Sequence, residues 1–78
     1  MPTVLRQGPY RLFFYSNEGH EPPHVHVSRE NRLAKFWLGT VSVAENFGFE
    51  RFELRRIARI VSDHQLQLLE AWREFFSD

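Results

Sequence analysis

The pattern of hydrophobic and polar residues changes once along the chain, near residue 45. Before this point, aromatic and β-branched residues alternate with polar ones, and this period of two is typical of strands with one covered face. After it, apolar residues recur every three or four positions, which is the spacing of an amphipathic helix. The pattern therefore predicts an α+β fold in one domain, with a sheet in residues 1–44 and helices in residues 50–76.

The alternation in the first half predicts three strands, which are Tyr10–Tyr15, His24–Ser28 and Leu33–Leu38. A short strand at Val4–Arg6 would precede them, and Thr40–Val43 would either continue the third strand or add a short edge strand. Because the connections between them are short or turn-like, we expect a mainly antiparallel sheet of three or four strands.

The loop of residues 16–23 is the longest connection in this predicted sheet. Pro22 and Pro23 hold its end extended and exclude a helix there. Loops longer than an ordinary hairpin connection often carry function, so this segment is a candidate part of a site.

The helical half carries one stripe of residues that recur every three or four positions and are apolar apart from Gln65, namely Leu54, Ile57, Val61, Gln65, Leu68, Trp72 and Phe75. A single straight helix over Glu50–Phe76 would be roughly 40 Å long, which overhangs so small a sheet. Ser62 followed by Gln65 fits a capping box, so we expect two helices, or one kinked helix, with the break at this point. The alternative is an unbroken helix whose end reaches a partner.

The two faces of the predicted sheet differ in chemistry. The wholly apolar face, which the helices should cover, consists of Leu12, Phe14, Val25, Val27, Ala34, Phe36 and Leu38. The opposite face, which we call the outer face, consists of Arg11, Phe13, Tyr15, His24, His26, Lys35 and Trp37. Three aromatic rings are too much apolar area to leave in water. Three coverings remain open, namely the loop of residues 16–23, a protein partner, and nucleic acid stacked on the rings.

The sequence His24-Val25-His26 places two imidazoles on one side of a strand. This spacing suits a metal ion if a further ligand is supplied, and the possible ligands are Glu18, His20, Glu21 and His64. It also suits acid–base chemistry, in which Arg11 or Lys35 holds a phosphate, as in a metal-independent ribonuclease. Glu18 or Glu21 could orient an imidazole. The structural alternative is that the histidines only bridge strand and loop by hydrogen bonds.

Three arginines, Arg51, Arg55 and Arg59, line one face of the first helix. Residues 51–59 contain four arginines against one glutamate, whereas residues 60–78 contain one arginine against four acidic residues. This row is either a solvated helix face with salt bridges or a dock for an acidic partner or a phosphate backbone.

Composition excludes several classes of function. The chain has 78 residues, no cysteine and a formal net charge of zero, so disulfides, cysteine nucleophiles and a wholly basic nucleic-acid binder are excluded. No apolar run approaches the ~18 residues of a membrane span, and the first residues lack the layout of a signal peptide. We therefore expect a cytoplasmic protein that does not bind membranes.

Several segments of the chain together form a specific signature, which includes Phe13-Phe14-Tyr15-Ser16-Asn17-Glu18-Gly19, Glu21-Pro22-Pro23-His24-Val25-His26-Val27, Ala34-Lys35-Phe36-Trp37-Leu38, Glu53-Leu54 and Leu69-Glu70-Ala71-Trp72. In these segments the chain resembles a family of very short bacterial and archaeal proteins catalogued as a domain of unknown function. The chain departs from the family pattern at His20, where a small polar residue is expected, and at Glu50, where a helix-capping Asn or Ser is expected. Family members are often encoded beside a small protein that resembles a DNA-binding antitoxin, so the resemblance implies a toxin–antitoxin-like pair with this protein as the candidate toxin.

Taken with this resemblance, the residues predict a small protein of a toxin–antitoxin-like pair that, if it is the toxin, acts on RNA through the outer face, without a metal or other cofactor. The expected catalytic residues are His24, His26, Arg11 and Lys35, the binding residues are Phe13, Tyr15, Trp37, Arg51, Arg55 and Arg59, and Glu18 and Glu21 support them. The alternative is a non-catalytic interaction module, whose aromatic face binds a second copy or the antitoxin-like partner.

Overall fold

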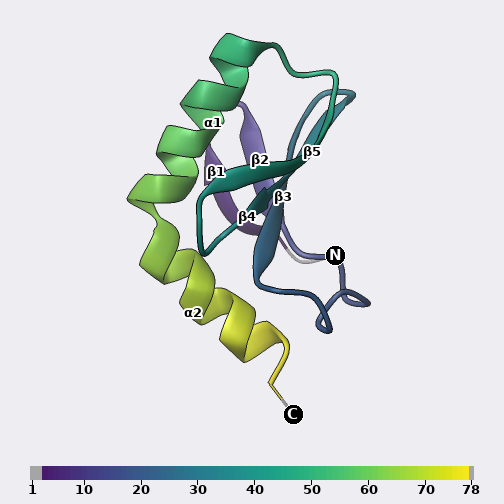
Figure 1. Cartoon of the computed structure of the whole chain (residues 1–78), viewed down its shortest axis with the longest axis vertical. Coiled ribbons are helices and arrows are strands. Elements are labelled where there is room, and N and C mark those ends of the chain that lie inside the picture. Colours follow the sequence, from purple (N-terminus) through teal and green to yellow (C-terminus); the bar gives the residue numbers. More distant parts are fainter. Residues whose placement is uncertain (1–2, 78) are drawn as a thin grey trace.

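The computed structural model of the chain describes residues 3–77, which form one layer of strands and one layer of helices. The strands are β1 (Thr3–Gln7), β2 (Tyr10–Phe13), β3 (His24–Arg29), β4 (Arg32–Trp37) and β5 (Ser42–Phe47), and the helices are α1 (Arg51–Asp63) and α2 (Gln65–Phe75). Figure 1 shows the two helices following one another along the same side of the sheet. The predicted α+β class is therefore confirmed.

The five described strands form one antiparallel sheet in the order β1-β2-β3-β4-β5, so each strand pairs with its neighbour in sequence. The expectation of three or four strands is wrong, because β5 is a full strand that begins two residues after Thr40 and runs to Phe47. Nearly all of β5 is exposed, since it lies at the edge of the sheet. A strand with little buried area needs no strict alternation of apolar and polar residues, so the sequence pattern predicted β5 only as a short strand.

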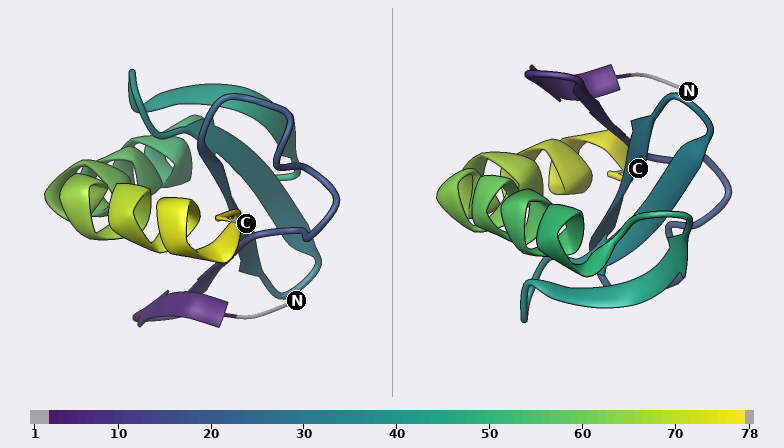
Figure 2. Two further views of the ribbon diagram at one scale, coloured as in Figure 1. Left: turned by 90° about the horizontal axis from the view of Figure 1, so that it is seen from below. Right: turned by 90° about the horizontal axis from the view of Figure 1, so that it is seen from above.

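The strand register confirms the predicted sorting of side chains onto two faces. Val27 pairs with Leu12 on one side and Ala34 on the other, and Val25 pairs with Phe36. These five side chains are at most 1% exposed. Figure 2 shows both helices on one side of the sheet, and the buried side chains of Ile57, Val61, Leu68 and Trp72 complete the core.

Two helices are present, as expected, but the predicted cap is wrong. Ser62 lies inside α1, and the junction is His64, whose backbone has φ −114° and ψ 19° and whose side chain makes no cap bond to α2. Instead, the Gln65 side chain donates to the carbonyl oxygens of Leu38 (2.7 Å) and Gly39 (3.3 Å), which ties the junction to the end of β4. The position of the break between the helices therefore depends on a contact with the sheet rather than on a local capping motif.

The start of α1 is anchored by a buried carboxylate. Tyr10 Oη donates to Glu53 Oε2 at 2.9 Å, and the guanidinium groups of Arg29 and Arg32 donate to the two Glu53 oxygens at 2.8 and 3.3 Å. Glu50, which precedes α1, makes no side-chain cap bond, as its residue type predicts. Neither helix of the described residues is long and apolar enough to cross a membrane.

Candidate functional site

The middle of the outer face is a row of side chains that crosses three strands. His26 pairs with Phe13 on β2 and with Lys35 on β4, and His24 pairs with Trp37. These residues share one face because their registers match the period of two. The sequence-based grouping is therefore correct for the central strands.

Most of this row is covered by the chain itself. His24 is 0% exposed, His26 4%, Lys35 8% and Phe13 2%, whereas Tyr15, Trp37 and Arg11 are half-buried. The segment between β2 and β3 wraps around the end of the sheet to the side away from the helices (Figure 2). Of the three coverings considered above, the loop is the one that the structure shows.

The loop delivers the Glu18 carboxylate to both histidines. Glu18 Oε1 lies 2.8 Å from His24 Nε2 and 2.7 Å from His26 Nε2. His24 Nδ1 donates to the carbonyl oxygen of Pro22 at 2.9 Å, so both nitrogens of this buried ring have oxygen partners. Glu18, His24 and His26 thus form a cluster, which we call the Glu18 cluster.

The charges of this cluster are strongly coupled. Burial acts to raise the pKa of Glu18, but hydrogen bonds from His24 and His26 and their charge outweigh it, so the Glu18 pKa lies below its ordinary value. Burial lowers the pKa of His26, and the attraction of Glu18 offsets this only in part. Both pKa shifts are consistent with an ionised Glu18 that accepts a hydrogen bond from the Nε2–H group of a neutral His26.

A second loop carboxylate pairs with the lysine. Lys35 Nζ donates to Glu21 Oε1 at 2.6 Å and lies 4.8 Å from the centre of the Trp37 ring. The hydrogen bond to Glu21 raises the pKa of Lys35, and the same bond lowers the pKa of Glu21. The two loop carboxylates therefore balance the positive charge that the outer face would otherwise present.

Aromatic rings surround both imidazoles. The His26 ring stacks on Phe13 at 5.6 Å and meets the edge of Tyr15 at 4.4 Å between ring centres. The His24 ring lies 5.7 Å from Trp37 and 4.9 Å from Trp72, which reaches it from α2. These rings keep bulk water away from the cluster, so its electrostatic interactions are stronger than they would be in water.

Arg11 lies at the β1 side of the outer face. Its Nε donates to Thr3 Oγ1 at 2.7 Å, and its guanidinium group lies 4.4 Å from the centre of the Phe13 ring. Arg11 thus shares the face with the histidines, as expected, and is held beside Phe13.

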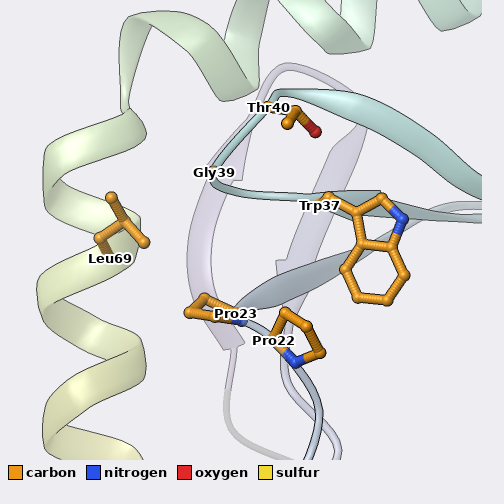
Figure 3. A pocket seen from close by; sticks show the side chains of 6 residues that line it. All are labelled: Pro22, Pro23, Trp37, Gly39, Thr40 and Leu69. Atoms are coloured by element: carbon orange, nitrogen blue, oxygen red, sulfur yellow. The ribbon is translucent and has the colours of Figure 1, made fainter.

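An apolar groove adjoins the cluster. It has a volume of about 300 Å³ and is lined by Pro22, Pro23, Trp37, Gly39, Thr40 and Leu69. Figure 3 shows that the loop prolines, the end of β4 and Leu69 of α2 surround this space from three directions. Because Pro22 also accepts the His24 hydrogen bond, the groove and the cluster share one wall.

The arginine row lies elsewhere. Arg51, Arg55 and Arg59 are exposed on α1, in the helical layer on the opposite side of the sheet, and Arg59 lies 3.8 Å from Asp63. The structure therefore does not bring this row together with the outer face. His20 and His64 also lie outside the Glu18 cluster, so Glu18 alone of the possible further ligands joins the two histidines.

The Glu53 network was missed by the sequence analysis, although a signal was present. Glu53 precedes Ile57 and Val61 by four and eight residues, and all three are buried on one side of α1. A carboxylate on the buried side of a helix requires hydrogen-bond donors or positive charges as partners. Its two arginines also line a second cavity of about 530 Å³ with Gly48, Glu50, Phe52, Glu53 and Arg56.

Comparisons with known proteins give one match. Neither the curated proteins nor the solved structures contain a match to this chain. One family model matches residues 10–73, which include the whole Glu18 cluster, Lys35 and the groove. The chain therefore belongs to the family described as a domain of unknown function, DUF4160.

Proposed function

We propose that this protein is the toxin of a cytoplasmic toxin–antitoxin-like pair and that it acts on RNA at the outer face of its sheet. The observation that supports the proposal is the convergence of two buried imidazoles on one Glu18 oxygen, at 2.8 and 2.7 Å. The toxin–antitoxin part of the proposal rests on the family resemblance, since family members are often encoded beside an antitoxin-like protein. RNA is proposed as the substrate class because the face combines imidazoles, cations and aromatic rings.

Stability alone does not account for this arrangement. Five ionisable residues, Glu18, Glu21, His24, His26 and Lys35, are packed together in a chain of 78 residues. Desolvated ion pairs often contribute less stability than apolar residues of the same volume. Clusters of coupled titratable groups are concentrated at functional sites.

The face offers what phosphodiester cleavage requires. His26 can accept a proton, because its lowered pKa keeps the imidazole neutral at neutral pH and, with the Nε2 hydrogen donated to Glu18, Nδ1 is the basic nitrogen. Lys35 and Arg11 can hold a phosphate, and a substrate phosphate would replace the Glu21 carboxylate as the partner of Lys35 Nζ. The half-buried rings of Tyr15 and Trp37 can stack on bases.

Growth on induced expression tests the proposal. Wild-type protein should arrest growth, and the purified protein should cleave RNA. His26→Ala should relieve the arrest and reduce cleavage by about 100-fold or more. His20→Ala is the matched control, because His20 lies in the same loop but outside the cluster. Normal growth with abundant folded wild-type protein would contradict the proposal.

The alternative is a non-catalytic module that binds its small partner protein. The apolar groove between Trp37 and Leu69 favours this alternative, because it has room for an apolar side chain of the partner. In that case Trp37→Ala should weaken a complex with the partner, whereas His26→Ala should leave the complex intact.

A further inference from the structure

Both ring nitrogens of His24 face oxygen atoms. The Pro22 carbonyl can only accept, so His24 Nδ1 carries a hydrogen and donates it at 2.9 Å. This leaves Nε2, on a ring that is 0% exposed, directed at Glu18 Oε1 at 2.8 Å. A nitrogen and a carboxylate oxygen that face each other in this way are two potential ligands of one metal ion.

The second histidine adds a third ligand atom at the same place, once the hydrogen that Nε2 shares with Glu18 moves to Nδ1. His26 Nε2 lies 2.7 Å from the same Glu18 oxygen, and the three ligand atoms all lie within 4.8 Å of one another. An imidazole that binds metal through one nitrogen commonly donates the other N–H to a backbone carbonyl or a carboxylate. The His24–Pro22 hydrogen bond has this form.

We propose that Glu18, His24 and His26 bind a divalent transition-metal ion, and that Zn²⁺ is a suitable probe ion. Two imidazoles and one carboxylate are a ligand set used by zinc, with a further position left for water or substrate. This inference departs from the expectation of a site without metal.

The required movement involves the loop and both imidazole rings. Tetrahedral coordination at about 2.1 Å separates ligand atoms by roughly 3.4 Å. Glu18 Oε1 must therefore withdraw from each Nε2 by roughly 0.6 Å relative to its present distances. The two imidazole nitrogens, which lie within 4.8 Å of each other, must adopt the same separation of roughly 3.4 Å. Glu18 is 21% exposed at its side chain, so it is the ligand with the most freedom to move.

The charges around the cluster allow a cation. Lys35 is the positive residue paired with His26 across the strands, and its charge is balanced by Glu21 at 2.6 Å. Glu21 Oε1 also lies 3.9 Å from His24 Nδ1, which adds negative charge on that side of the ring. Glu18 is the most exposed of the three proposed ligands, with 21% of its side chain exposed, so an ion would arrive from its side.

Binding of the ion stands independently of the RNA reaction, whereas a role for the ion in that reaction rests on the proposed function. When bound, the ion would supply Lewis-acid chemistry at the Glu18 cluster. His26 would then act as a ligand in place of its role as the base, and Lys35 and Arg11 would remain the residues that hold phosphate.

Direct metal titration of the full chain tests the inference. After treatment with a chelator, the protein should bind one equivalent of Zn²⁺ by calorimetry and elemental analysis, and the ion should raise the melting temperature. Glu18→Gln and His26→Gln should each weaken binding by about 10-fold or more, since losing a ligand costs at least as much as losing its supporting hydrogen bond. His20→Gln should bind as the wild type does.

The outcomes separate the two proposals. Weak, non-stoichiometric Zn²⁺ uptake, or equal binding by wild type and a folded Glu18→Gln variant, would overturn the metal site. Glu18→Gln keeps the test decisive if His26→Gln fails to fold, because Glu18 lies on the loop rather than in a buried strand. Stoichiometric binding without growth arrest would contradict the RNA toxin and leave the metal site standing.

Discussion

Glu53 shows how much a single buried carboxylate can organise in a small domain. It is 4% exposed and accepts hydrogen bonds from Tyr10, Arg29 and Arg32, which belong to three different strands. Burial acts to raise the pKa of Glu53, but the hydrogen bonds from Tyr10 and Arg29 and the charges of both arginines outweigh it. The Glu53 pKa therefore lies below its ordinary value of 4.5.

This shift predicts a specific pH dependence. A carboxyl group whose pKa is lower in the folded chain stabilises the fold above its unfolded pKa, and that stability is lost as pH falls through the folded value. Glu53→Gln should therefore lower the melting temperature at neutral pH and flatten the decline below about pH 4.5. Thermal melts across pH, followed by circular dichroism, measure this effect. Glu70→Gln, at an exposed position of α2, should follow the wild-type profile, and an unchanged profile for Glu53→Gln would contradict the assignment.

The residues of the Glu18 cluster differ in how far the sequence predicted them. His24 and His26 were placed on one face by their spacing alone, and Lys35 and Phe13 by alternation on neighbouring strands. Glu18 was only one of several acidic or histidine residues that could join the two histidines. A loop has no regular repeat from which the direction of its side chains can be predicted. The choice among them depends on the path of the loop.

At the scale of elements, the loop contacts the end of α2 at the residue next to Glu18. A Cβ atom added to Gly19 would lie 2.5 Å from Phe76 Cδ1, so the ring at the end of α2 packs directly on this position. Phe76 in turn packs on Trp72 with ring centres 4.1 Å apart. The residue next to Glu18 is therefore held by the far end of the chain.

We predict that Gly19→Ala disturbs both stability and the cluster. Either Phe76 or the loop must shift, which should cost about 1 kcal/mol of the free energy of unfolding and weaken Zn²⁺ binding several-fold. Gly39→Ala is the matched control, since a Cβ there meets nothing within 4 Å. Urea unfolding and metal titration of both variants provide the measurements, and equal behaviour of the two would show that the Gly19 contact has no role in placing Glu18.

The elements that sequence analysis misjudged share a physical cause. The edge strand β5 has little buried area, so its pattern is weak, and the helix break is set by Gln65 bonding to the end of β4 rather than by Ser62. The central strands and both helices bury one clear face, and there the periodicity was sufficient.

At the scale of the whole molecule, Trp72 joins the helical layer, the core and the candidate site. It is 6% exposed and its ring lies 5.3 Å from Phe14, 4.9 Å from His24 and 4.1 Å from Phe76. A chain of 78 residues has a thin core, so one such side chain accounts for a large part of its stability.

Trp72→Ala should therefore destabilise the fold by about 3–5 kcal/mol, a large share of the ~5–15 kcal/mol typical of whole domains. Urea unfolding monitored by circular dichroism should show a much lower midpoint or an unfolded chain. Arg73→Ala, at the exposed neighbouring position, should change the free energy of unfolding by no more than about 0.5 kcal/mol. A Trp72→Ala midpoint close to that of the wild type would mean that α2 contributes little to the core.

The local order of residues determined the α+β class, the assignment of central-strand side chains to two faces, and the presence of two helices, because strand and helix periods are properties of neighbouring residues. Tertiary structure decided which distant groups meet. Glu18 meets His24 and His26 from a loop that packs on Phe76, and Glu53 meets Arg29 and Arg32 where the start of α1 lies against the sheet. Such contacts depend on how the layers pack, and no periodic pattern along the chain encodes the conformation of a loop.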